Sequence, residues 1–374
     1  MFRKLLNYYK IFSMRGIHIF LFALLIIAIG AGIYIKHIAK SFEVASDGLR
    51  GSVARELEFI ERTSNSFQSF DRFKKEPYTI LFAGDIMLTR GVAGKVERFG
   101  EGDYTYPFVY ITDVLQSADI AFANLEGPIS SRGKNQGSIY SFRMEPKVIA
   151  GLTFAGFDVL SVANNHIWDW GSDALEDTLN ILEVNNIIPV GAGRNYAEAN
   201  TAKTVALGNT KIAFLAYTNL MPQSLQAIKD APGLSEFNFL AITERIKKAK
   251  AENDIVVVSL HWGEEYEPYP TASERETAHA FVDAGADLII GHHSHVVRDV
   301  ERYVPALDAN RVGWIAYSLG NFVFDQNFSE ETMRGLLLEA TIQNENISNT
   351  TIIPVELTAT FQPHIRNELR VLSY

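Results

Sequence analysis

The chain has 374 residues, of which 47% are hydrophobic, and carries a formal net charge of −10. This length allows one large domain or two ordinary ones with a substantial buried core. The acidic balance offers no electrostatic footprint for nucleic acid, so we expect no nucleic-acid partner. The chain contains no cysteine. Disulfides and thiolate ligands are therefore excluded, and any metal site must use His, Asp, Glu, Asn or water.

The N-terminal part combines basic residues with a long uncharged stretch. Residues 17–35 (IHIFLFALLIIAIGAGIYI) contain no charge, and a helix of that length spans about 28 Å, close to the ~30 Å core of a bilayer. Lys and Arg precede it without an acidic residue, which favours a cytoplasmic N-terminus over residues 1–16 and an exported remainder. We predict a single-pass anchor in the cell membrane. A cleaved signal peptide and a buried soluble helix are the alternatives.

The remainder of the chain divides by its hydrophobic pattern. Residues 36–77 are polar and mixed in charge, which indicates a stalk or linker, with an amphipathic helix packed on the domain as the alternative. Beyond them, apolar β-branched runs of strand length alternate with helix-like segments such as 172–185 and 272–284. This pattern predicts an α/β domain with a largely parallel core over 78–326. The alternating tail, 327–374, is predicted as a β-rich extension of the same domain.

Polar side chains follow several of the apolar runs, at the point where each predicted strand ends. In parallel sheets the ligand binds off these carboxyl ends, so we expect the side chains to meet there. Carboxylate, amide and imidazole groups suit Mn²⁺, Fe, Zn²⁺ or Mg²⁺. The alternative is that several of them only hydrogen-bond buried loops. These side chains are Asp85, Asn124, Glu126, Asn165, His166 and His261.

The stretch ADLIIGHHSH (286–295) crowds three of the chain's nine histidines into four positions. We expect a strand that ends at Ile290, followed by a loop. If that loop stays extended, His293 and His295, two positions apart, point into one space. Neutral imidazole is a common metal ligand, so the stretch favours a metal or catalytic site.

Six phrases of the chain carry a family resemblance. They are FAGDIMLTRGV (82–92), ANLEGPIS (123–130), SVANNHIWDWG (161–171), SLHWGEEYEPYPT (259–271), GADLIIGHHSHV (285–296) and YSLGNFVFD (317–325). In this order they resemble the CapA/PgsA-like family of capsule (poly-γ-glutamate) synthesis proteins, a branch of the calcineurin-like metallophosphoesterase superfamily. The resemblance implies a metallophosphoesterase-like αββα sandwich with an N-terminal transmembrane helix.

The resemblance also implies a centre for one or two divalent cations, with Mn, Zn, Fe and Mg as candidates. Met87 stands where the first motif of the superfamily has a histidine, so one ligand of the first metal is missing. The implied ligands are Asp85 and His295 at the first metal, Glu126 with Asn124 in the bridging region, and Asn165, His261 and His293 at the second metal.

Four further residues receive roles from the resemblance. His166 would be the general acid or a phosphate-contacting imidazole, and Asp169 would orient it. Arg90 and Trp262 would line the substrate pocket, with core packing as the alternative for Trp262.

The sequence favours two functions, with a pure binding module that has a vestigial site as a third, weaker alternative. The first is a membrane-anchored, metal-dependent hydrolase that acts outside the cytoplasm on a phosphoester, or on an amide or ester bond of an anionic cell-surface polymer. The second is a non-catalytic accessory subunit that binds or guides the polymer during synthesis and export. For both, membrane-bound polymer synthase subunits are the expected partners.

Overall fold

The computed structural model describes residues 77–306, 308–366 and 372–373. Within these residues no helix combines the length and the hydropathy needed to span a bilayer. The predicted cytoplasmic N-terminus, the predicted anchor and nearly all of the predicted stalk fall on residues 1–76, outside the described residues. Membrane topology therefore stays a prediction.

The first sheet is mixed. Its strands are β1 (Tyr78–Ile86), β2 (Ile120–Leu125), β3 (Val159–Ser161), β4 (Ile188–Val190), β13 (Asn321–Val323), β14 (Arg334–Gln343), β15 (Asn346–Leu357), β16 (Pro363–Ile365) and β17 (Leu372–Ser373). The order is β16-β15-β14-β1-β2-β3-β4, with β13 beside β1 and β17 beside β15. Strands β1 to β4 run parallel, whereas β14 pairs antiparallel with β1. The alternating tail thus extends the sheet that begins the domain.

The second sheet has a parallel centre and antiparallel edges. Its strands are β6 (Lys203–Leu207), β7 (Thr210–Thr218), β9 (Ile255–His261), β10 (Leu288–His292), β11 (Val300–Tyr303) and β12 (Gly313–Ala316). The order is β11-β12-β10-β9-β7-β6, in which β7, β9, β10 and β12 are parallel. A separate short pair joins β5 (Ala192–Gly193) and β8 (Gly233–Leu234).

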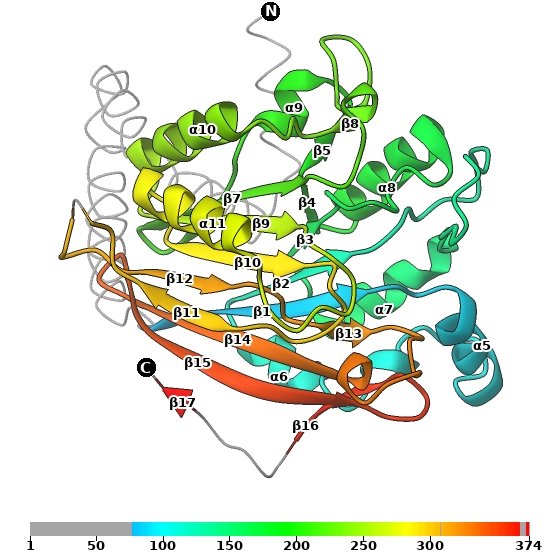
Figure 1. Ribbon diagram of the computed structural model, residues 1–374. Helices are drawn as coiled ribbons and strands as arrows, with labels where there is room; N and C mark the ends of the chain where they lie inside the picture. Colours follow the sequence, from blue (N-terminus) through cyan, green and yellow to red (C-terminus); the bar gives the residue numbers. More distant parts are fainter. Residues whose placement is uncertain (1–76, 307, 367–371, 374) are drawn as a thin grey trace, which may run out of the picture. The chain divides into compact units, whose positions relative to one another are not determined.

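Helices connect the parallel strands. The α-helices are α5 (Arg90–Phe99), α6 (Thr112–Ser117), α7 (Ile149–Ala155), α8 (Gly171–Val184), α9 (Tyr196–Asn200), α10 (Phe239–Glu252) and α11 (Ala272–Ala284). Short 3-10 helices are η1 (Tyr106–Phe108), η2 (Pro146–Val148), η3 (Gln223–Leu225) and η4 (Glu331–Met333). Figure 1 shows α10 and α11 together over the second sheet. The helices predicted at 172–185 and 272–284 are confirmed as α8 and α11.

Alternate residues of the buried strands face different layers, because side chains alternate along a strand. In β1, Ile80 and Phe82 lie in a core shared by the two sheets. Leu81 and Ala83 lie in a second core, which contains residues of α6, α7 and α8 such as Leu152. The two faces of β1 therefore pack into two different hydrophobic cores.

The second sheet repeats this division. Val257 of β9 faces the core between the sheets, whereas Val256 and Val258 pack with Ile246 of α10 and Phe281 of α11. The layers thus follow the order helix, sheet, sheet, helix. The predicted α/β class is confirmed, and the carboxyl ends of β1, β2, β9 and β10 are placed beside one another.

Candidate metal centre

Polar side chains from the two sheets meet where the parallel strands end. Asp85, near the end of β1, accepts a hydrogen bond from the Asn124 side chain on β2, with 2.8 Å between Oδ1 and Nδ2. The same amide nitrogen lies 3.3 Å from Nδ1 of His261, the last residue of β9. All three residues are buried. The two sheets are therefore joined by a polar contact at the edge where the sequence predicted a site.

Gly84 allows a close approach of backbone beside Asp85. A Cβ at this position would lie 2.0 Å from the carbonyl oxygen of Gly320, and that oxygen accepts a hydrogen bond from the Asp85 amide at 3.0 Å. The glycine therefore accommodates the protein's own chain. The contact ties β1 to the segment that leads into β13.

The histidine-rich stretch differs in detail from its prediction. Strand β10 continues to His292, two residues beyond the predicted end at Ile290. The following loop is not extended, because His293 and His295 have left-handed φ angles of 91° and 56°. Such backbone costs roughly 1–3 kcal/mol at each non-glycine residue. The two rings nevertheless converge, with centroids 5.9 Å apart.

Backbone and side-chain contacts hold this loop against β1. The His293 amide donates a hydrogen bond to Oδ2 of Asp85 at 3.1 Å, and Nδ1 of His295 lies 3.6 Å from the same oxygen. His295 Nδ1 also lies 2.9 Å from Oδ1 of Asn321. His292 is fully buried, and its Nδ1 lies 3.2 Å from Oδ1 of Asp85. The Asp85 carboxylate is thus the common partner of the loop.

Glu126 carries the strongest indication of a cation site. The residue is fully buried, and among the described residues neither of its carboxylate oxygens has a hydrogen-bond partner. Oε1 lies 3.8 Å from Nε2 of His295 and 3.9 Å from Nε2 of His166. Burial, with the negative charge of Asp85, raises the pKa of Glu126 well above its usual value. A cation is the partner that such a carboxylate lacks.

Three buried histidines, His261, His293 and His295, form what we call the imidazole cluster. The ring centroids of His261 and His293 are 4.9 Å apart, and Nε2 of His261 lies 2.8 Å from Oδ1 of Asn165. Burial lowers the pKa of all three, that of His293 to about 3, with a neighbouring imidazole adding to the effect there. The cluster is therefore neutral at physiological pH, the state in which imidazole binds metals.

His166 is oriented by a carboxylate, as the resemblance implied. Its Nδ1 donates to Oδ2 of Asp169 at 2.8 Å, and the same oxygen accepts the Phe142 amide at 2.8 Å. The Phe142 ring stacks on the imidazole with 3.9 Å between centroids. These contacts fix the tautomer and leave Nε2 facing Glu126.

The two residues predicted to bind substrate occupy different places. Arg90 makes a bidentate pair with Asp325, with 2.9 Å between Nη2 and Oδ1, and its guanidinium lies 5.1 Å from the ring centroid of Phe142. Arg90 and His166 therefore both lie beside the Phe142 ring. Trp262 is 2% exposed and stacks on Tyr317 in the core beside α10 and α11, which is the core-packing alternative.

Candidate ligand atoms fall into two groups. In one, atoms of Asp85, Glu126 and His261 lie within 4.8 Å of one another, and in the other, atoms of Glu265, His293 and His295 do so. Met87 is buried in the core that contains residues of α6, α7 and α8, and its sulfur accepts a hydrogen bond from the Thr89 amide at 3.2 Å. The donors are nitrogen and oxygen only, and the unpartnered Glu126 oxygens face them. The residues therefore fit a divalent cation.

Three residues of this site received no individual role from the sequence. Asn164 is buried and bridges Asn124 Oδ1 and the Leu125 carbonyl, at 3.1 and 2.8 Å. Asn321 contacts Nδ1 of His295 through its side-chain oxygen. The sequence feature that could have identified it is the strand-like run YSLGN, which ends in this asparagine. Glu265 follows the His261 run directly, yet its sequence position alone did not separate it from Glu264.

Comparisons with known proteins identify the family. The family model described as "Bacterial capsule synthesis protein PGA_cap" matches residues 79–326. The capsule biosynthesis protein CapA of Bacillus anthracis is 32% identical over 292 residues, covering 76% of this chain and 68% of the relative. The PGA biosynthesis protein CapA of Bacillus subtilis (strain 168) is 32% identical over 279 residues, covering 74% and 70%.

Among solved structures, the calcineurin-like phosphoesterase YfkN from Bacillus subtilis is similar with a TM-score of 0.39 and 14% identity, covering 80% of this chain and 90% of that one. This likeness is too weak to carry an assignment. The sequence matches, which extend through every strand-end residue of the centre, confirm the expected resemblance to the CapA-like proteins. The chain belongs to the bacterial capsule synthesis protein family PGA_cap.

Proposed function

We propose that the chain is a metal-dependent hydrolase of capsule or cell-envelope polymer synthesis. The observation that carries the proposal is the buried Glu126 carboxylate, which lacks a hydrogen-bond partner among the described residues and faces both His166 and His295. A buried carboxylate without a partner is costly in free energy. Its position beside the imidazole cluster supports a cation as its partner.

The residues that would hold one or two divalent cations come from both sheets. They are Asp85, Asn124, Glu126, Asn165, His261, His293 and His295. Asn124 and Asn165 already contact His261, so a cation would compete with these hydrogen bonds. The chemistry that a divalent cation supplies in such a site is Lewis acidity and activation of water. Mn, Zn, Fe and Mg all accept nitrogen and oxygen donors, so all four are candidates for the cation.

His166 supplies the proton transfer in this proposal. Because Nδ1 donates to Asp169, Nε2 is the nitrogen that faces the reacting groups and exchanges a proton with them. A protonated Nε2 would donate to the leaving group as the bond breaks. The Asp169 carboxylate stabilises the positive charge of the imidazolium, and the Phe142 ring limits rotation of the imidazole. Arg90, whose guanidinium lies 5.1 Å from the centroid of the Phe142 ring, is the proposed substrate contact.

The family supports a proposal for the substrate class. The Bacillus subtilis relative is named a PGA biosynthesis protein, and we propose for this chain a phosphoester, or an amide or ester bond in an anionic polymer of the poly-γ-glutamate kind. The net charge of −10 disfavours direct contact with a polyanion. A metal centre supplies the positive charge that such a substrate needs. Membrane-bound polymer synthase subunits are the proposed partners.

We also propose that the chain is anchored in the cell membrane by residues 17–35, with its main domain outside the cytoplasm. The uncharged sequence of that segment supports this proposal. Protease added to intact cells should remove the main domain while leaving a cytoplasmic control protein intact. Protection of the domain until the cells are lysed would contradict the topology.

The test of function compares His166→Ala with His279→Ala in the full-length protein. His279 is a half-buried histidine of α11 that pairs with Glu301 at 2.8 Å, outside the candidate centre. We expect His166→Ala to abolish turnover of a phosphoester panel and of poly-γ-glutamate while keeping the bound metal, and His279→Ala to keep both. Undiminished turnover in His166→Ala would refute its role. A wild-type protein that binds metal without turnover would favour the accessory subunit.

A further inference from the structure

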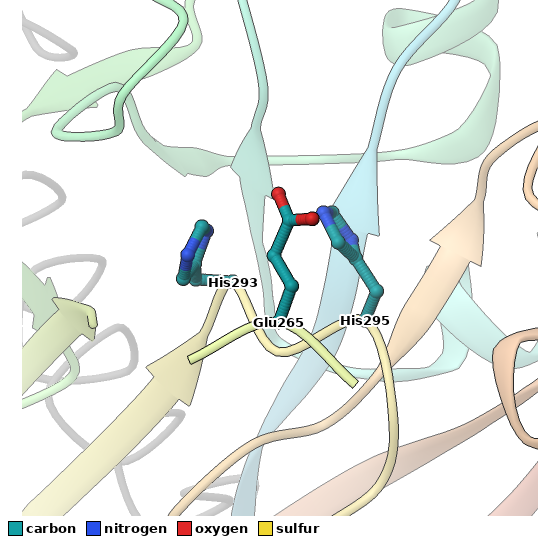
Figure 2. A group of neighbouring side chains, drawn as sticks. All are labelled: Glu265, His293 and His295. Atoms are coloured by element: carbon teal, nitrogen blue, oxygen red, sulfur yellow. The ribbon is translucent and has the colours of Figure 1, made fainter. Parts of the chain in front are cut away.

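Glu265 lies opposite the two histidines that follow β10. Its carboxylate and one ring nitrogen from each of His293 and His295 lie within 4.8 Å of one another. Figure 2 shows Glu265 extending from its own segment between the two rings, with its carboxylate beside His295. Both histidines are buried, whereas Glu265 is exposed. The carboxylate therefore closes this group on the side of the solvent.

A second group of ligand atoms lies beside the first. Asp85, Glu126 and His261 form it, and Oε1 of Glu126 lies 3.8 Å from Nε2 of His295. Nδ1 of His293 is buried and has no hydrogen-bond partner among the described residues. Two adjacent donor sets and mutually repelling carboxylates are the arrangement that a pair of cations stabilises.

Arg298 fixes the backbone on both sides of Glu265. Its guanidinium donates to the carbonyl oxygens of Glu264 and Glu267, each at 2.7 Å, and to Oε1 of Glu274 at 2.9 Å. Arg298 is 3% exposed, so this clamp is sheltered from water. The Tyr266 amide also donates to the Ser294 carbonyl at 2.8 Å, which ties the segment directly to the histidine loop.

The neighbouring residues are shaped to admit this clamp. Gly263 has a φ of 85°, and a Cβ there would lie 2.2 Å from Oε1 of Glu274 and 2.7 Å from Nη1 of Arg298. Oε2 of Glu274 accepts the Thr271 amide at 2.6 Å in the capping box of α11. One carboxylate thus holds the guanidinium and the start of the helix. The backbone on both sides of Glu265 is therefore held in place.

We propose that Glu265 is a ligand of a second divalent cation, held with His293 and His295 beside a cation held by Asp85, Glu126 and His261. Arg298 is the positioning residue of that ligand. The inference deepens the proposed function and rests on its metal centre. It adds to the proposed centre a ligand from the loop that follows β9.

The test measures Mn²⁺ binding to metal-stripped full-length protein by titration calorimetry and by the Mn²⁺ retained per chain. Wild type should bind two ions. In Glu265→Gln one ion should bind at least ~10-fold more weakly, with the other unchanged. Glu264→Gln is the matched control, because it makes the same charge change on the adjacent exposed residue and keeps the carbonyl that Arg298 contacts. It should bind as wild type does.

The outcomes separate the two proposals. Identical Mn²⁺ binding by Glu265→Gln and Glu264→Gln would overturn the inference and leave the metal centre of the proposed function standing. Absence of any Mn²⁺ from folded wild type would overturn the metal centre itself, and the inference with it. Folded Arg298→Lys should weaken the same ion as Glu265→Gln. Wild-type affinity in that variant would overturn the positioning role of Arg298.

Discussion

Phe122 links the stability of the domain to the geometry of its centre. It is 1% exposed on β2 and stacks across the sheet interface on Phe214, with ring centroids 5.9 Å apart and planes at 9°. It also tilts against Phe82 at 5.6 Å and lies 6.3 Å from the ring of His292. Phe122→Ala would remove the ring from the middle of the core between the sheets. The strands on both sides are held in their sheets, so they cannot move in to fill the cavity.

The expected cost is about 3–5 kcal/mol, which combines the lost burial with the cavity left behind. For a domain of this size, that corresponds to a fall in Tm of roughly 5–8 °C. Thermal unfolding of the full-length protein, followed by intrinsic fluorescence with chelator present, measures the change. Phe154→Ala is the matched control, since its ring is 39% exposed, and we expect it to shift stability by less than ~1 kcal/mol. A Phe122→Ala variant no less stable than the control would refute the packing argument.

Three further predictions concern pH, a helix cap and a glycine. Burial lowers the pKa of each histidine in the imidazole cluster. Below about pH 6.5 the unfolded chain therefore binds protons that the folded chain does not bind. The free energy of unfolding should fall by up to ~1.4 kcal/mol per pH unit for each histidine. The raised pKa of Glu126 offsets part of this, and a Tm independent of pH from 7.5 to 5 with chelator would contradict the prediction. Thr271→Ala removes a capping box and should cost ~1 kcal/mol in chemical unfolding, whereas Thr271→Ser should be nearly neutral. Gly84→Ala would place a Cβ 2.0 Å from the Gly320 oxygen and should lower the free energy of unfolding by at least ~1–3 kcal/mol. In the control Gly94→Ala the new Cβ meets no atom within 4 Å, so this variant should not be destabilised. Thermal unfolding measures both.

The local sequence determined the elements and most of the candidate ligands. Apolar runs of strand length predicted β1, β2, β9 and β10 because strands buried on both faces need side chains that are apolar throughout. The polar residues after these runs were sufficient to locate the centre, because the carboxyl ends of parallel strands share one edge. The run FDVLSVANNH became only a short strand, Val159–Ser161, since its polar end turns into the site.

The tertiary structure decided which of these residues face one another. His293 and His295 converge through left-handed backbone rather than through an extended loop, a choice that contacts with Asp85 and Asn321 impose. Glu265 and Glu264 are indistinguishable by local pattern, and the tertiary structure separates them, because the Glu265 carboxylate lies within 4.8 Å of ring nitrogens of His293 and His295. Local periodicity specifies where a side chain can point, but long-range hydrogen bonds and packing select its partner, because their energies depend on residues that are distant in the chain.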